Sequence, residues 1–375
     1  MEKAAPARER DVSLDAFKGF CLALIMLLHI QAGKGPSWLG AWANPFKLAG
    51  FFVVSGYLLS LKPSASGFRD AVARRWRGLM WPYFTFGFLA VAVSILMADT
   101  LSGATAASNA ILSRMALLRG HSTLWFLPVL FVAEALFIGT SVLEGRLRGR
   151  IGRCAALALP LSALAAICAS ALLSPVAAPF IKLPQGRQIV ANLVLTPLRA
   201  LPAFVCIAAG YLAYGRLLAL SRRSAAVGAA ASAVLVAVGF AAGRMLGGID
   251  WNNNIYGGNL CLFLLSGVSS SLGLMLAFSI LCRYARMPVL RFIGVNSLVL
   301  MATHLPLPFI QGARSVSGWI CARAAWLGTF LSEHATLNGL WILAIVILME
   351  IPLVLLFSRT PLKVLLGRPS TPRRA

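Results

Sequence analysis

Lys18 and His29 are the two residues of the first apolar stretch whose types could take part in chemistry. They are eleven positions apart, and eleven helical steps of about 100° return to within about 20° of the starting direction. Both side chains therefore project from one helix face, separated by about 16 Å along the axis at a rise of about 1.5 Å per residue. Asp15, one turn before Lys18, shares this face and can pair with the lysine. His29 could accept the proton of an attacking hydroxyl, because a neutral imidazole near pH 7 is a suitable general base.

Other ionisable residues also fall inside apolar stretches, where each costs about 2.5 to 3.5 kcal/mol at mid-membrane. Glu134 should face the interior of a bundle, where it either pairs with a basic residue or orients the ring of His29. His304 is a second candidate for orienting that ring, although hydrogen bonds between packed helices are an equally good use for it. His29 itself has the same structural alternative. Glu350 is a weaker case of the same kind.

A basic segment between two apolar stretches contains Arg74 and Arg77, one helical turn apart. Two guanidinium groups at this spacing could hold the phosphates of one ligand. The alternative is a stop signal that orients the protein and contacts membrane lipid head groups. The residues alone do not favour either interpretation.

The elements that must position these residues are membrane-spanning helices. The chain is 59% hydrophobic and only 12% charged, about half the charged fraction of a typical soluble domain. Stretches of about 20 apolar residues, the length that crosses a membrane, recur from Phe17 to Phe357. They predict an all-α, polytopic helical bundle with about ten spans. The predicted spans are 17–33, 44–61, 80–98, 123–143, 154–173, 199–219, 225–243, 259–281, 293–311 and 338–357.

The basic residues indicate the orientation of this bundle. With a cytoplasmic N-terminus, the cytoplasmic segments hold 24 of the 34 Lys and Arg residues, as the positive-inside rule requires. We expect an N-terminal tail (1–16), a membrane domain (17–357) and a basic C-terminal tail (358–375), with both tails cytoplasmic. The net charge of +23 does not indicate a nucleic-acid partner, because the charges lie between apolar spans rather than on one soluble face. The seven cysteines form no CxxC pair, and we predict no metal site.

Five short motifs, in order along the chain, resemble those of the acyltransferase-3 family of membrane-bound acyltransferases. The chain is most similar to its short members described as fucose 4-O-acetylase-like. The motifs are Ser13 to Gly19 with His29; Phe51 to Leu59; Arg74 to Arg77 with Pro82 and Tyr83; Leu124 to Leu127; and Phe292 to Ser297 with His304. This sequence has Lys18 where many members have arginine, which weakens any bidentate contact at that position.

The resemblance implies transfer of an acyl group, commonly acetyl, from cytoplasmic acyl-CoA to a hydroxyl of a sugar, polysaccharide or lipid-linked glycan. It implies His29 as catalytic base, Lys18 as its motif partner, and Arg74 with Arg77 as the donor-binding segment. Acyl-CoA would be a co-substrate, with no bound cofactor. The implied location is the bacterial inner membrane. The resemblance to short members also implies that no soluble esterase-like domain follows the last span.

The outer connection from Asp250 to Asn259 is the candidate for contacting the acceptor. Asn252 and Tyr256 represent the amides and aromatic faces that suit sugar hydroxyls and CH groups. An ordinary solvated turn is the alternative. For the whole chain, the main alternative function is a membrane transporter of acyl groups or glycans, although no pair of related halves typical of transporters is found. A purely structural scaffold would not need His29 and Glu134 at membrane depth.

Overall fold

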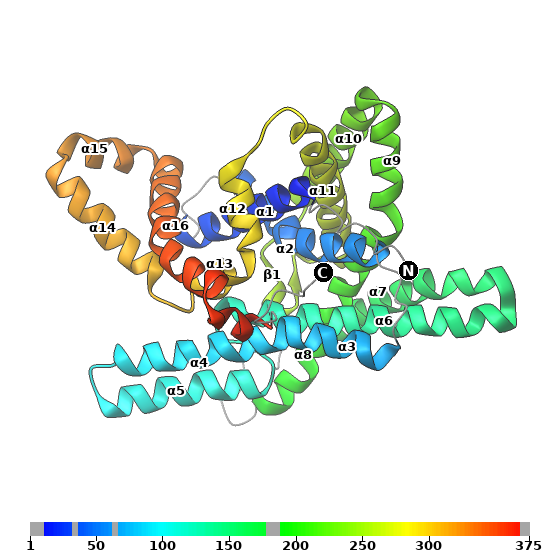
Figure 1. Cartoon of the computed structure of the whole chain (residues 1–375), viewed down its shortest axis with the longest axis horizontal. Coiled ribbons are helices and arrows are strands. Elements are labelled where there is room, and N and C mark those ends of the chain that lie inside the picture. Colours follow the sequence, from blue (N-terminus) through cyan, green and yellow to red (C-terminus); the bar gives the residue numbers. More distant parts are fainter. Residues whose placement is uncertain (1–10, 32–36, 62–66, 178–187, 368–375) are drawn as a thin grey trace, which may run out of the picture.

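The protein is a bundle of helices, to which the described residues add one short β-hairpin. A computed structural model describes residues 11–31, 37–61, 67–177 and 188–367. Figure 1 shows helices crossing one another at several angles, with helical hairpins projecting from the centre. The prediction of an all-α membrane bundle is confirmed.

The elements follow one another along the chain as a long series of helices, with the hairpin in its second half. Those up to residue 177 are α1 (Val12–Gln31), α2 (Ser37–Ser60), α3 (Phe68–Arg75), the π-helix η1 (Trp76–Met80), α4 (Trp81–Leu96), α5 (Leu101–Ala116), η2 (Ser122–Trp125), α6 (Phe126–Ile151), η3 (Gly152–Leu157) and α7 (Ala158–Ala177). Those that follow are α8 (Gln188–Ala209), η6 (Gly210–Tyr214), α9 (Gly215–Arg223), α10 (Ala225–Arg244), β1 (Ile249–Asp250), η7 (Trp251–Asn253), β2 (Ile255–Tyr256), α11 (Leu260–Leu281), α12 (Pro288–Val295), α13 (Ser297–Thr303), α14 (Phe309–Arg323), α15 (Ala325–Glu333), α16 (Ala335–Arg359) and η8 (Pro361–Leu366).

Helix α1 lies at the centre, in contact with α2, α11, α12, α13 and α16. Its crossing with α12 depends on two glycines. A Cβ atom built on Gly294 would lie 1.7 Å from the carbonyl oxygen of Asp15, and one built on Gly19 would lie 1.9 Å from that of Leu290. Small residues at a membrane-helix crossing allow the backbones to approach this closely. The crossing therefore fixes the Lys18 end of α1 against α12.

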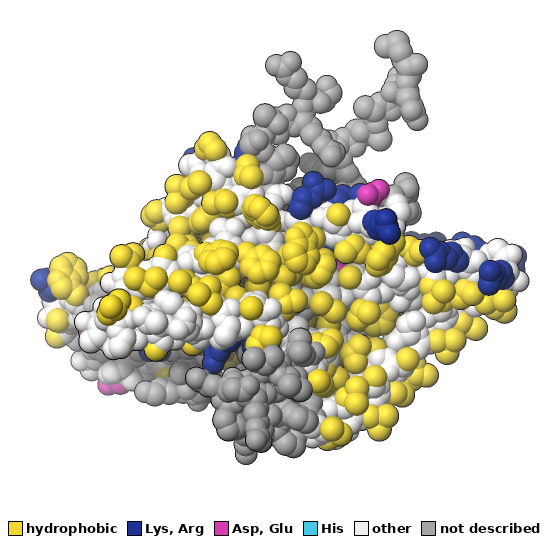
Figure 2. Space-filling view, turned by 90° about the horizontal axis from the view of Figure 1, so that it is seen from below, with side chains coloured by type: hydrophobic (Ala, Val, Ile, Leu, Met, Phe, Trp, Pro, Cys, Tyr) yellow, Lys and Arg dark blue, Asp and Glu magenta, His cyan; other side chains and the backbone are white. Residues whose placement is uncertain are grey.

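Seven stretches of the described chain are long and apolar enough to cross a membrane, rather than the ten predicted. One of them, Ser122–Val176, contains two helices, α6 and α7, which fold back on each other at η3. Helix α2, predicted as 44–61, has 24 residues, but Asn44, Pro45 and Lys47 lower its hydropathy. Figure 2 shows a broad hydrophobic surface with Lys and Arg side chains gathered along its upper right edge.

The predicted span 293–311 is wrong as a single helix. The chain instead forms α12 and α13, which are separated at Asn296, and residues 304–308 are not helical. Pro306 and Pro308 explain the second break, because proline has no backbone N–H to donate. The break places His304 at the end of α13, inside the bundle.

Besides α3, three further helices lie wholly or mostly in segments predicted as connections. They are α5, which packs against α4, and the pair α14 and α15, which packs against α16. Helix α5 is mostly exposed, and its four buried residues lie along one face (Ala104, Ser108, Ile111 and Met115). Both helical hairpins project from the bundle in Figure 1.

The connection from Asp250 to Asn259 is not an ordinary solvated turn. Strands β1 and β2 pair antiparallel around η7 and return the chain into the bundle. Trp251 and Tyr256 are 3% and 6% exposed, and the indole Nε1 of Trp251 donates to the carbonyl oxygen of Arg199 at 3.1 Å. The segment is thus part of the packed interior, where it can form the wall of a site.

Candidate active site

His29 lies near the end of α1, and its ring contacts that of His304. The Nδ1 atom of His29 is 3.3 Å from Nε2 of His304, and the ring centroids are 5.5 Å apart. His304 is completely buried, and its Nδ1 is 2.9 Å from the carbonyl oxygen of Leu300 one turn earlier. The sequence put 275 positions between the two histidines, and the tertiary structure makes them a pair.

The partners of the two rings determine where the protons lie. A carbonyl oxygen can only accept, so the Nδ1 atom of a neutral His304 carries the proton and its Nε2 has a free lone pair. That lone pair accepts from Nδ1–H of His29. A neutral His29 is then left with a lone pair on Nε2, the atom that could take a proton from a substrate. Of the two candidates for orienting His29, the structure brings His304 to its ring.

His29 opens onto a cavity of about 290 Å³ formed by α1, α2, η2, the start of α6 and the β1–η7 segment. Its polar lining comes from Asn44, Lys47, Ser122, Thr123, Asp250 and Asn252. Lys47 makes no ion pair or hydrogen bond with any described residue, and Asp250 is the acid whose charge acts on it. A base, a cation and several hydrogen-bonding groups therefore face one cavity.

Arg199 stabilises the wall of this cavity by contacting two residues that line it. It is fully buried, and its guanidinium donates from Nη1 to Oδ1 of Asn252 at 2.6 Å and from Nη2 to Oγ1 of Thr196 at 3.0 Å. The same group lies 5.5 Å from the ring centre of Trp125, which lines the cavity. Asn252 therefore lines the cavity, with its side-chain oxygen already engaged by Arg199. Its predicted contact with the acceptor stays a prediction.

Tyr256 does not line the cavity among the described residues. Its hydroxyl donates to Oδ1 of Asn254 at 2.9 Å, and burial raises the pKa of the phenol well above its usual value. Tyr256 also packs on Phe263, with ring centroids 5.0 Å apart. It supports the loop instead of facing a ligand.

A second cavity, of about 190 Å³, adjoins the first. It is almost entirely apolar and reaches from Gly78 and Leu79 of η1 to Leu298 of α13. Thr123, Phe126 and Met301 line both cavities, so the two meet at these residues. The hydroxyl of Thr123 donates to the carbonyl oxygen of Met301 at 2.7 Å, which ties η2 to α13 at the junction. Two cavities that share these three lining residues thus lie between the segment after Arg77 and His29.

The sequence profile of the family described as Acyltransferase domain matches residues 11–359. The chain belongs to the acyltransferase-3 family. It is accordingly a membrane acyltransferase. No curated protein and no solved structure gives a match.

Glu134 of this acyltransferase lies in α6 and is bonded away from His29. Its Oε1 accepts a short hydrogen bond from the hydroxyl of Ser55, and its Oε2 lies 3.1 Å from Nε of Arg75. The alternative in which Glu134 orients His29 is therefore wrong, and the alternative of a basic partner is confirmed. The physical reason is charge: a buried carboxylate is stabilised far more by a guanidinium than by a neutral ring.

The basic segment of this acyltransferase lies in α3 and η1. Arg75, which lies between Arg74 and Arg77 in the chain, has a structural role. Arg75 pairs with Glu134, whereas Arg74 and Arg77 are exposed. Arg77 directly precedes Gly78 and Leu79, which line the apolar cavity. Of the predicted donor-binding pair, Arg77 therefore lies next in the chain to the lining of that cavity.

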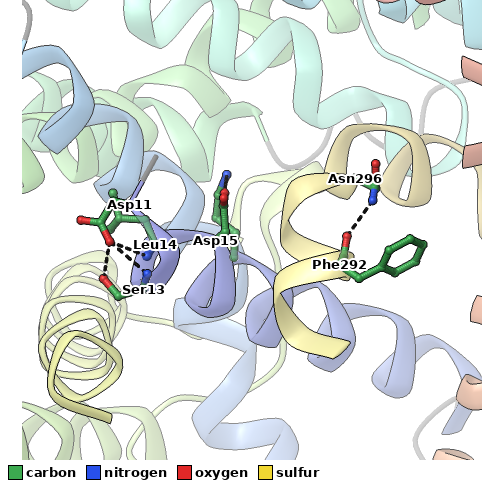
Figure 3. A network of polar contacts seen from close by, with 7 residues as sticks. Asp11, Ser13, Leu14, Asp15, Phe292 and Asn296 are labelled. Atoms are coloured by element: carbon green, nitrogen blue, oxygen red, sulfur yellow. Dashed lines mark hydrogen bonds and ion pairs between the residues drawn. The ribbon is translucent and has the colours of Figure 1, made fainter. Parts of the chain in front are cut away.

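The predicted pairing of Lys18 with Asp15 is confirmed, since Nζ of Lys18 is 2.8 Å from Oδ1 of Asp15. Figure 3 shows Asp15 between the start of α1 and α12. Asp11 caps α1 there, accepting from the backbone N–H of Ser13 at 2.9 Å and from its hydroxyl at 2.6 Å. Neither Lys18 nor Asp15 lines the cavity at His29. The pair belongs to the opposite end of α1.

Sequence reasoning missed four residues of this region: Asn44, Lys47, Arg75 and Arg199. Lys47 and Asn44 carried a usable signal, because both are polar residues in an otherwise apolar segment, as His29 is. Arg199 carried the same signal at the edge of a predicted span. Among the described residues, no group of three or more His, Cys, Asp or Glu side chains is placed to hold a metal ion.

Proposed function

We propose that this acyltransferase moves an acyl group, commonly acetyl, from cytoplasmic acyl-CoA to a hydroxyl of a sugar or glycan on the outer side of the membrane. Its fucose 4-O-acetylase-like character and its location in a bacterial inner membrane, with both termini cytoplasmic, are part of this proposal. The junction of the two cavities at Thr123, Phe126 and Met301 is the observation that carries it. A donor and an acceptor entering from opposite sides would meet there, next to His29.

The donor enters through the apolar cavity. Arg74 and Arg77 are exposed, and Arg77 directly precedes the cavity-lining residue Gly78. Both suit the phosphates of CoA, because guanidinium groups bind phosphate oxygens through charge-assisted hydrogen bonds. The apolar walls suit the uncharged arm that carries the thioester. Lys18, about 16 Å along α1 from His29 by helical rise, holds Asp15 and adds positive charge at the same side of the membrane.

The reaction follows from the protonation of the histidine pair. Nε2 of His29 takes the proton of the acceptor hydroxyl while the oxygen attacks the thioester carbonyl carbon. Nε2 of His304 accepts a hydrogen bond from Nδ1–H of the resulting His29 imidazolium, and this bond holds the ring in position. The Lys47 ammonium, which lines the same cavity, stabilises the developing oxyanion. The C–S bond then breaks, an ester forms, and His29 returns its proton to the CoA thiolate.

Mass spectrometry of cell-envelope and secreted glycans tests this function. Cells with the gene should show an acyl mass on a glycan that cells without it lack. His29→Gln should remove nearly all of it, because a positioned base contributes about 10² to 10⁴-fold in rate. His334→Gln is the matched control, since His334 is exposed and lies outside both cavities.

Substantial acylation by a well-inserted His29→Gln protein would contradict the base role. Movement of an unmodified glycan across the membrane, with no acyl mass gained, would instead favour the transporter alternative. Cysteine labelling tests the orientation: reagents should reach Asn253→Cys and Lys363→Cys from opposite sides of the membrane. Labelling of both from one side would contradict the topology.

A further inference from the structure

Glu350 is a buried carboxyl group that the proposed reaction does not use. It lies in the apolar helix α16 and is completely buried. Within the described part of the chain it lines neither of the two cavities that meet beside His29. An acid at membrane depth is costly, and it is retained mainly where it has a function. Because Glu350 faces neither cavity, it can act only through another residue.

The contacts of Thr303 indicate the charge of this group. The hydroxyl of Thr303 lies 2.8 Å from the carbonyl oxygen of Val299 and 2.5 Å from Oε1 of Glu350. A threonine hydroxyl has one hydrogen to donate, and a carbonyl oxygen can only accept. Both contacts are hydrogen bonds only if Thr303 donates to Val299 while Glu350 donates to Thr303. Glu350 must then carry a proton.

The burial of Glu350 favours the same assignment. An ionised carboxylate loses its hydration inside a bundle, and a paired cation or several donors must compensate for that loss. The carboxylate of Glu134 has such partners in Arg75 and Ser55. Glu350 forms no ion pair with any described residue, and its Oε2 atom has no hydrogen-bond partner among them. The neutral acid is the form that fits these surroundings.

The bond from Glu350 ends on the residue that directly precedes His304. Helix α13 has only seven residues, and a helix this short is not stable through its own backbone bonds. Its position therefore depends on contacts with its neighbours. Thr123 of η2 bonds to Met301 on one side. Glu350 bonds to Thr303 from α16, which packs against α13 (Figure 1).

We propose that Glu350 is a positioning residue of this acyltransferase: a neutral carboxylic acid that donates to Thr303 and thereby holds His304 against His29. This inference rests on the proposed function, in which His304 accepts the Nδ1–H of His29. The two ring nitrogens are 3.3 Å apart, so a small shift of α13 would break their bond. The alternative is a hydrogen bond that only joins two packed helices, and kcat would then not depend on it.

Infrared spectroscopy of the purified protein in detergent tests the neutral acid without any acyl transfer. At neutral pH the wild-type protein should show the carbonyl stretching band of a protonated carboxyl group, which an ionised carboxylate lacks. Glu350→Gln should remove this band. Glu333→Gln is the matched control, because Glu333 is exposed at the end of α15, and it should leave the band unchanged.

Kinetic measurements with acetyl-CoA test the positioning role. Glu350→Leu should lower kcat by about 2- to 13-fold, the loss expected for one neutral hydrogen bond, and leave the KM for acetyl-CoA unchanged. Its thermal midpoint should also be unchanged, because the Thr303 hydroxyl keeps its bond to Val299. Glu350→Gln should recover most of the rate, since its amide N–H can donate to Thr303. In a protein that already carries His304→Leu, Glu350→Leu should cause no further loss, because the two residues act in series.

Three results would overturn the proposal. A carboxyl band that persists in Glu350→Gln would mean that Glu350 is ionised. A Glu350→Gln protein as slow as Glu350→Leu would mean that the charge matters and the donated hydrogen bond does not. An unchanged kcat in Glu350→Leu would reduce the bond to a contact between packed helices. Absence of acyl transfer by the wild-type protein, with the band lost in Glu350→Gln, would instead contradict the proposed function while confirming the neutral acid.

Discussion

Replacement of His304 by leucine removes the group that accepts the Nδ1–H of His29. The lost bond is 3.3 Å long, at the weak end of the range for nitrogen donors. A neutral, partly buried bond of this kind contributes about 0.5 to 1.5 kcal/mol, which corresponds to a fall in kcat of about 2- to 13-fold. This loss is clearly smaller than the one expected for His29→Gln, because His304 positions the base and does not itself exchange protons with substrate.

The assay uses inside-out membrane vesicles supplied with labelled acetyl-CoA. The rate at which label is incorporated into glycan is measured and divided by the amount of folded protein. His304→Leu should lower kcat and leave the KM for acetyl-CoA unchanged. His304→Gln should recover part of the rate, because its amide oxygen can accept the same N–H. His334→Gln again serves as the control.

Two results would refute this reasoning. A loss as severe as that of His29→Gln would give His304 a direct role in proton transfer. An equal rate in the leucine and glutamine variants, with both well folded, would mean that the acceptor atom is irrelevant and that the ring only fills space.

Three further predictions concern other parts of the molecule. Lys47→Met should lower kcat by about 10²-fold if its ammonium stabilises the oxyanion, with donor binding measured by calorimetry unchanged. Arg74→Gln combined with Arg77→Gln should weaken acetyl-CoA binding by about tenfold or more, and unchanged affinity would reduce the segment to a topology signal. Gly294→Ala should lower the free energy of unfolding in detergent by about 1 to 3 kcal/mol, because its Cβ would lie 1.7 Å from a backbone oxygen of α1. Gly318→Ala, where a Cβ would meet nothing within 4 Å, should leave the thermal midpoint unchanged.

The sequence determined the membrane class and the first helix of the site. Length and apolarity of a span are local properties, and a polar residue within it stands out because lipid penalises it. For this reason the positions of His29 and Lys18 as polar residues of the first span, and the pairing of Lys18 with Asp15, could be predicted from neighbouring residues alone. The same local reasoning failed where a helix is interrupted: residues 293–311 have the apolar length of a span, but Asn296 and the two prolines divide them.

Only the tertiary structure decided which polar groups meet. By sequence, Glu134 could equally well pair with a basic residue or orient His29. The packing of α6 against α3 places it against Arg75. His304 reached His29 because the break before Pro306 placed its ring inside the bundle. The packing of α2 brings Lys47 to the site, and the packing of α8 brings the fully buried Arg199 there. Such pairings depend on the crossing angles and axial shifts of helices far apart in the chain, which are set by packing of whole surfaces and not by any one segment.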